Sequence, residues 1–146
     1  MHFEGTFTVR APRARVYSFL LNPKEFSPCI DDPHTIEVID ADHFRGTVKA
    51  GVSFIRGNFT WSADVKERVP SERAQMAVHG SGMGSGFDVV ANLAVSEAGG
   101  LSTVKWAADV QMSGTIATVG ARLLQGTTEK KTNAFFENAR RILEGH

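Results

Sequence analysis

The sequence is organised around its final stretch, GTIATVGARLLQGTTEKKTNAFFENARRILEG, which covers residues 114–145. No proline interrupts this stretch, and its apolar residues recur at the spacing of one helix face. That face carries Ile116, Leu123, Leu124, Phe135, Ala139 and Ile142. Ser113 or Thr115 can cap the first turn, and Gly145 stands where a helix would stop. We therefore predict a helix of about 28 residues, roughly 42 Å long, which needs a large apolar partner.

The first half of this predicted helix has small residues on its apolar face. They are Ala117, Gly120, Ala121, Gly126 and Thr127. Because a glycine inside a helix costs up to about 1 kcal/mol relative to alanine, Gly120 and Gly126 need an explanation. Either the helix backbone packs closely on its partner, or the missing side chains leave room for a bound molecule. The sequence leaves both explanations open.

The rest of the chain predicts that the partner is a curved antiparallel sheet. An alternating strand covers residues 3–9, and two short helices follow it, at about residues 12–21 and 23–27. Six more alternating segments lie at residues 35–40, 44–54, 58–66, 73–79, 87–95 and 104–112, with Gly57 marking one of the turns between them. No helix-length crossover separates these segments, which favours an antiparallel meander over a parallel sheet. We expect an α+β fold in a single domain of residues 1–146, with a seven-stranded sheet wrapped around the C-terminal helix.

Charge and cysteine content narrow the class of protein. The chain has 146 residues with 16 Lys and Arg against 16 Asp and Glu, and this zero net charge argues against a nucleic-acid binder. Cys29 is the only cysteine, which excludes an intrachain disulfide and fits a reducing compartment. The sequence has no recognisable signal peptide and no apolar stretch of the roughly 20 residues that a membrane helix needs. We therefore expect a cytoplasmic protein whose membrane contact, if any, is peripheral.

Motifs that usually indicate phosphate or metal chemistry fail in detail. The glycine-rich run over residues 80–86 lacks the spacing of a phosphate loop and is followed by no lysine, so it predicts a flexible hairpin. Cys29 has no sequence signature of a nucleophile. The five histidines, none of which has metal-binding spacing, are His2, His34, His43, His79 and His146. We expect neither a metal nor a cofactor.

The presumed interior is apolar and contains few groups for acid–base catalysis. Asp64, Asp88 and Asp109 fall on the polar face of their segments and should point to solvent. The apolar face is rich in large side chains, namely Phe44, Phe54, Phe59, Trp61, Met76, Phe87 and Trp106. These residues can form either a filled core or the wall of a lipophilic pocket. The pattern favours a binding protein over an enzyme.

The order of elements resembles the helix-grip (START/Bet v 1-like, SRPBCC) superfamily. Within it, the chain resembles CoxG, a family of carbon monoxide dehydrogenase subunits, over nearly its whole length. The matching stretches are residues 3–9, 11–12, 16–17, 21–23, 29–30, 80–82, 86–87, 113–117 and 119–124, together with Phe26. The most specific of them are FEGTFTV at residues 3–9 and the final pair, SGTIA and VGARLL.

The resemblance implies an accessory protein of molybdenum-containing CO dehydrogenases or related hydroxylases. Such a protein would be tied to membrane delivery and able to hold a lipophile such as a quinone. One departure is that Asp31-Asp32-Pro33 stands where the family usually has Pro-Gly, which changes the turn at the expected cavity entrance. Longer members continue into a linker and a membrane-anchoring helix, which we do not expect here, so the anchor function does not carry over.

We therefore expect a hydrophobic ligand, quinone- or lipid-like, in a cavity between the sheet and the C-terminal helix. The expected ligand-binding residues are Phe26, Val48, Val52, Phe59, Trp61, Met76, Phe87, Val89, Trp106, Gly120, Leu123 and Leu124. No catalytic residue is expected, and Gly120→Leu should abolish ligand uptake. One alternative is a polyketide cyclase/aromatase-like enzyme that uses Tyr17, His79 or Thr127. The other alternative is a protein-binding accessory module with a filled core.

Overall fold

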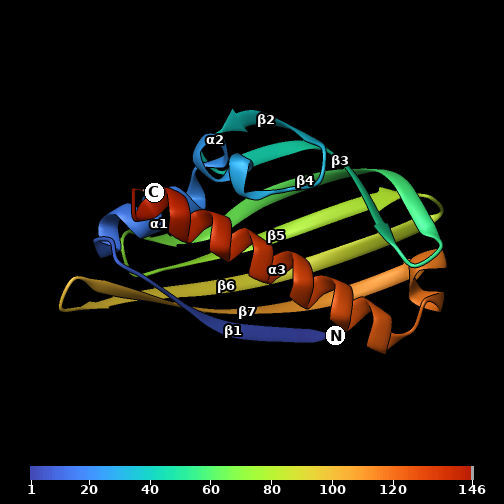
Figure 1. Cartoon of the computed structure of the whole chain (residues 1–146). Helices are drawn as coiled ribbons and strands as arrows, with labels where there is room; N and C mark the ends of the chain where they lie inside the picture. The colour runs from blue at the N-terminus through green and yellow to red at the C-terminus, as the bar shows by residue number, and fades with distance from the viewer. Residues whose placement is uncertain (146) are drawn as a thin grey trace.

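The computed structural model describes residues 1–145 and consists of one sheet with a long helix lying across one of its faces (Figure 1). His146, one of the five histidines expected to lack a metal role, lies outside the described residues. The strands are β1 (His2–Val9), β2 (His34–Asp40), β3 (His43–Val52), β4 (Ile55–Val69), β5 (Arg73–Gly82), β6 (Ser85–Ala98) and β7 (Leu101–Gly114). The helices are α1 (Arg13–Leu21), α2 (Pro23–Phe26), the 3-10 turns η1 (Ser27–Cys29) and η2 (Thr115–Thr118), and α3 (Ala121–Leu143).

The sheet is an antiparallel meander whose ends are β1 and β2. Its seven strands lie in the order β1-β7-β6-β5-β4-β3-β2, and every neighbouring pair is antiparallel. The helices α1 and α2 fill the long connection from β1 to β2, as the prolines and the Asn22 side chain that accepts a hydrogen bond from the Lys24 N–H predict. The predicted helix-grip architecture is confirmed.

The long helix begins later than the sequence pattern predicts. Gly120 is its N-cap and has φ +104°, a backbone conformation that favours glycine and separates η2 from α3. The helix therefore has 23 residues and is roughly 34 Å long, shorter than the predicted 28 residues. Its buried face also differs, because Leu123 is 56% exposed and Ile142 is 41% exposed, while Phe136 stacks on Phe7 at 4.7 Å.

The β3–β4 turn also lies elsewhere than predicted. Gly57 belongs to β4, and the turn is formed by Ser53 and Phe54, with Ser53 at φ +55°. The cross-strand pair of Val52 with Ile55 leaves these two residues at the hairpin tip, so Phe54 is 68% exposed instead of facing the core. The glycine-rich run over residues 80–86 forms the β5–β6 hairpin, as expected.

The buried core is divided between the two ends of α3. The cluster near α1 includes Val9, Phe19 and Ala139, and it contacts Phe135 and Phe136 from the second half of α3. The cluster at the opposite end contains Ile55, Phe59, Ile116 and Leu124. A third, smaller cluster contains Phe44, Ala63 and Val65. Between Leu124 and Phe135, helix α3 places residues such as Thr127 above the sheet, and this is where the candidate site lies.

Candidate ligand cavity

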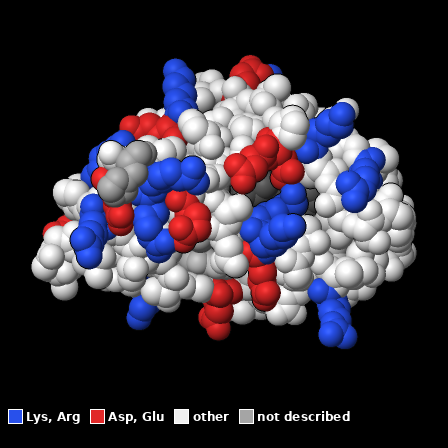
Figure 2. All heavy atoms as spheres, viewed as in Figure 1, with Lys and Arg blue, Asp and Glu red and all other residues white. Residues whose placement is uncertain are grey.

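A cavity opens between α3, the loop after η1 and the β3–β4 hairpin. Its volume is about 780 Å³, within the range of about 300–1,000 Å³ that is typical of small-molecule sites. Trp106 of β7, Phe135 and Phe136 of α3 supply aromatic surface, and Thr127 lines the same space. Figure 2 shows a hollow in this face of the molecule, with acidic and basic side chains gathered around it.

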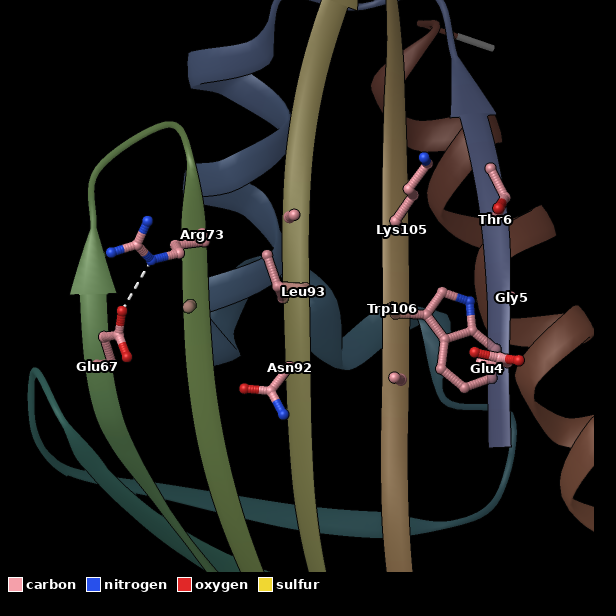
Figure 3. Close-up of a pocket in the computed structure, with 12 residues that line it drawn as sticks. Glu4, Gly5, Thr6, Glu67, Arg73, Asn92, Leu93, Lys105 and Trp106 are labelled. Carbon is pink, nitrogen blue, oxygen red and sulfur yellow. Dashed lines mark hydrogen bonds and ion pairs between the residues drawn. The ribbon is translucent and has the colours of Figure 1, made fainter. Parts of the chain in front are cut away.

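Three glycines on the concave face of the sheet each pair with a large aromatic residue on the neighbouring strand. The cross-strand pairs are Gly5 with Trp106, Gly46 with Trp61, and Gly80 with Phe87. A Cβ atom on these glycines would lie 2.9, 2.9 and 2.0 Å, respectively, from the partner ring. Each ring therefore lies flat over a position that has no side chain, as Figure 3 shows for Trp106 reaching from β7 to Gly5.

This arrangement explains how a sheet with so many aromatic residues leaves space above it. A ring that lies against the backbone covers the sheet with one layer of atoms, whereas an upright ring extends toward the opposing helix. Trp106 is only partly buried and has its indole 6.0 Å from the Phe136 ring. Strand glycines, and not the helix glycines that the sequence analysis emphasised, make room on this face.

Gly120 and Gly126 do not provide room for a ligand. A Cβ atom on either residue would meet no atom within 4 Å, and both residues are exposed. Gly120 is explained by its positive φ at the start of α3, so the expected effect of Gly120→Leu on ligand uptake is wrong. Nothing in the structure explains Gly126.

The other predicted ligand-binding residues divide between the cavity and the core. Trp106 lines the cavity, and Leu123 instead lies on the exposed side of α3. The residues that pack in the cluster around Ile55 are Val48, Val52, Phe59, Phe87 and Leu124. Those that pack around Phe44 are Phe26, Trp61 and Met76, while Val89 is half-buried on the concave face. A ligand-contact role for these residues stays a prediction.

The sequence analysis did not identify Phe135 and Phe136 as cavity residues. Phe135 was placed on the apolar face of the helix but not in the site, and Phe136 was placed on neither. Starting the helical periodicity at Ala121 instead of near Ile116 would have included both, because Leu124, Thr127 and Phe135 then share one face.

Charged residues surround the mouth of the cavity. Lys131 on α3 pairs with Asp32 at 2.7 Å. Asn138 Nδ2 donates hydrogen bonds to the Cys29 carbonyl and to Asp31 Oδ1, both at 3.0 Å. These contacts hold the loop that contains Asp31-Asp32-Pro33 against α3. The departure from the family pattern in this loop therefore supplies two of the rim carboxylates.

The groups named for an enzymatic alternative lie mostly outside the cavity. The Tyr17 hydroxyl donates to the Arg73 carbonyl at 3.0 Å in the cluster near α1, and burial raises its pKa. His79 lies on the exposed outer face and contacts Asp88 at 2.7 Å. Thr127 alone of the three lines the cavity. Burial, with a smaller effect of the Asp31 carboxylate, raises the pKa of the Cys29 thiol to about 11, so Cys29 is a poor nucleophile near neutral pH.

A second hollow, of about 630 Å³, lies on the outer face of the sheet (Figure 3). Its walls are exposed polar side chains, including Glu4, Asn92 and Lys105, and its one ion pair joins Arg73 to Glu67 at 2.8 Å. Asp88 and Asp109 are exposed on this outer face, and the partly exposed Asp64 also points outward, as expected. This hollow has no enclosed apolar surface and is a weaker candidate for a hydrophobic ligand.

Neither a metal cluster nor a membrane span is evident in residues 1–145. No three His, Cys, Asp or Glu side chains of this part of the chain lie close enough to hold a metal ion. No helix formed by these residues has both the length and the apolar character required to cross a bilayer.

The overall architecture is shared with several solved structures. A conserved protein from Geobacillus kaustophilus superposes with a TM-score of 0.92 at 18% identity, covering 99% of this chain and 96% of that one. A START superfamily protein from Mycobacterium smegmatis gives a TM-score of 0.73 at 10% identity, with coverages of 99% and 97%. The structure of Ara h 8.0201 gives 0.71 at 13% identity, with coverages of 100% and 99%. At these identities the likeness establishes the fold alone.

Sequence comparison assigns the family. No curated protein matches the chain. The model for CoxG, a family of carbon monoxide dehydrogenase subunits, however, matches residues 5–144, which include all seven strands in whole or in part and the whole of α3. The chain therefore belongs to the CoxG family of carbon monoxide dehydrogenase subunits.

Proposed function

We propose that this protein binds a hydrophobic small molecule, quinone- or lipid-like, in the cavity beneath α3 and does not transform it. The observation that carries this proposal is the cavity of about 780 Å³ with Trp106, Phe135 and Phe136 on its walls. Apolar and aromatic surface with few polar groups is typical of small-molecule sites. The positions of Tyr17 and His79 and the raised pKa of Cys29 leave no placed acid–base pair around a bound molecule, which favours binding over catalysis.

The family suggests the setting in which such binding would be used. Its name refers to carbon monoxide dehydrogenase, so we propose that the protein is a carrier or accessory component of a molybdenum-containing oxidoreductase of that type. The lone cysteine fits the cytoplasm, and contact with a membrane would be peripheral. A lipophilic electron carrier would need such a component because its apolar body is poorly soluble in water.

The first test is native mass spectrometry of protein purified from its own host, followed by solvent extraction of any bound species. A co-purifying quinone or lipid supports the carrier proposal and identifies the ligand class. An empty protein that also fails to bind the neutral dye Nile red contradicts the proposal. That result would favour a protein-binding accessory module instead.

A pair of matched variants links the binding to the cavity. Thr127→Trp places an indole in the cavity, whereas Asn133→Trp adds the same group to an exposed position of the same helix. Nile red binding should be lost in the first variant and kept in the second, with both remaining folded by circular dichroism. Equal binding by the two variants would place the dye outside the cavity.

A further inference from the structure

The charges around the cavity mouth are not balanced in their contacts. Five charged residues line the same opening: Asp31, Asp32, Arg56, Lys130 and Lys131. Asp32 is paired with Lys131 at 2.7 Å, and Asp31 accepts a hydrogen bond from Asn138 at 3.0 Å. Arg56 and Lys130 form no ion pair with any residue from 1 to 145. Both rim carboxylates are therefore engaged, and the free charges are positive.

We propose that the ligand is an amphiphile with an anionic head group, and that Arg56 and Lys130 bind this head group while the apolar part enters the cavity. This inference rests on the proposed function and narrows the class of molecule that the cavity accepts. A carboxylate or a phosphate monoester on an alkyl or isoprenoid chain fits the arrangement. A cationic head group would instead meet two uncompensated positive charges.

The positions of the two cations fit this division of the ligand. Arg56 begins β4 beside the hairpin tip, and its side chain lies over Gly51, where a Cβ atom would be 2.7 Å from Arg56 Cγ. Lys130 lies on α3 one turn after Thr127, so the two cations reach the opening from opposite elements. The planar guanidinium can donate two parallel hydrogen bonds to a carboxylate, and the ammonium adds a second charge. Trp106 and the two phenylalanines then remain for the apolar chain.

The test compares ligands that share a ten-carbon chain and differ only in the head group. Decanoate, decan-1-ol and decyltrimethylammonium, each below its micelle concentration, are titrated against the protein loaded with Nile red. We expect decanoate to displace the dye at about tenfold lower concentration than decan-1-ol, as two partly exposed ion pairs allow, and the cationic amphiphile to be weakest. Acetate, which has the head group without the chain, should not displace the dye.

Two double variants assign the preference to specific residues. Arg56→Gln with Lys130→Gln should bring decanoate and decan-1-ol to equal affinity without weakening the binding of the alcohol. The control, Arg10→Gln with Lys105→Gln, removes the same two charges from exposed positions outside this cavity and should keep the tenfold preference. High salt should reduce the preference in the unchanged protein because exposed charges are screened.

The outcomes separate this inference from the proposed function. If decan-1-ol binds as tightly as decanoate to the unchanged protein, the head-group inference fails while cavity binding stands. If the preference persists in the Arg56/Lys130 double variant, these residues are not the head-group site and the inference fails. If neither the dye nor any ten-carbon ligand binds, the proposed function itself fails.

Discussion

Replacing Gly5 with alanine tests whether strand glycines keep the cavity open. The new Cβ atom would lie 2.9 Å from Trp106 Cζ2 and 3.0 Å from two further atoms of the indole. Carbon atoms in favourable contact are about 3.5–4.0 Å apart, so the indole must move by at least ~0.6 Å. Because β1 lies beneath the ring, the indole moves away from the sheet and into the cavity.

Two opposing effects determine the stability of the Gly5→Ala variant. Forcing an extra methyl group into a packed site costs about 1–3 kcal/mol. Replacing glycine in a strand interior returns about 0.5–1 kcal/mol, since the unfolded chain has less conformational freedom to lose. We expect the free energy of unfolding to fall by about 1–2 kcal/mol and the affinity for Nile red to fall severalfold.

The assay uses urea unfolding for stability and Nile red titration for affinity. A Trp61→Phe background leaves Trp106 as the only tryptophan, so its emission reports the movement of this indole. Gly126→Ala is the matched control, because its Cβ atom meets nothing within 4 Å and its position is exposed in α3. This control should gain up to about 1 kcal/mol from helix propensity and keep the affinity unchanged.

One result would refute the reasoning about glycine and aromatic pairs. If Gly5→Ala leaves the Trp106 emission and the Nile red affinity unchanged and gains stability as Gly126→Ala does, the indole does not depend on the missing side chain. The space above the sheet would then need another explanation.

Three further predictions concern the start of α3, the cysteine and an exposed ion pair. Gly120→Ala should lower the free energy of unfolding by about 1–2 kcal/mol because of its φ of +104°, yet leave Nile red affinity unchanged; reduced affinity at full stability would contradict this. Cys29 should react with a thiol reagent at pH 8 only after unfolding, because burial raises its pKa to about 11; rapid labelling of the folded protein would argue against that burial. The hydrogen bond to Asp40 raises the pKa of His43 above 6.5, and bonds from the Asp42 N–H and His43 lower the pKa of Asp40 below 3.8. The stabilising effect of His43 is complete below its ordinary value and that of Asp40 above its own, so both are present between pH 3.8 and 6.5; an NMR titration should find the His43 pKa lowered by Asp40→Asn, and an unchanged value would rule out the pairing.

The sequence predicted the elements of the fold because those depend on local patterns. Alternation of apolar and polar residues in strands such as β4 and β7 reflects the period of an extended chain with one buried side. The absence of helix-length crossovers then favoured the antiparallel meander. The same local logic misplaced the start of α3, because Gly120 fits a helical pattern by spacing but adopts a positive φ.

The predicted site was less accurate, and the reason lies in contacts between distant residues. The rings of Trp61, Phe87 and Trp106 were correctly placed on the concave face, but periodicity does not indicate whether a ring stands upright or lies flat. That orientation depends on which residue stands opposite, and strand register alone pairs Trp106 with Gly5, about a hundred residues earlier in the sequence.

The sequence by itself determined the helix-grip architecture, the apolar concave face and the family, because each follows from periodicity and local motifs over the whole chain. Only the tertiary structure decided where the cavity opens and which charges border it. Arg56, Asp32 and Lys131 come from three separate elements, and the pairing of Asp32 with Lys131 leaves Arg56 free at the same opening. Such a balance of charges depends on distances across the fold, which residue spacing along the chain does not contain.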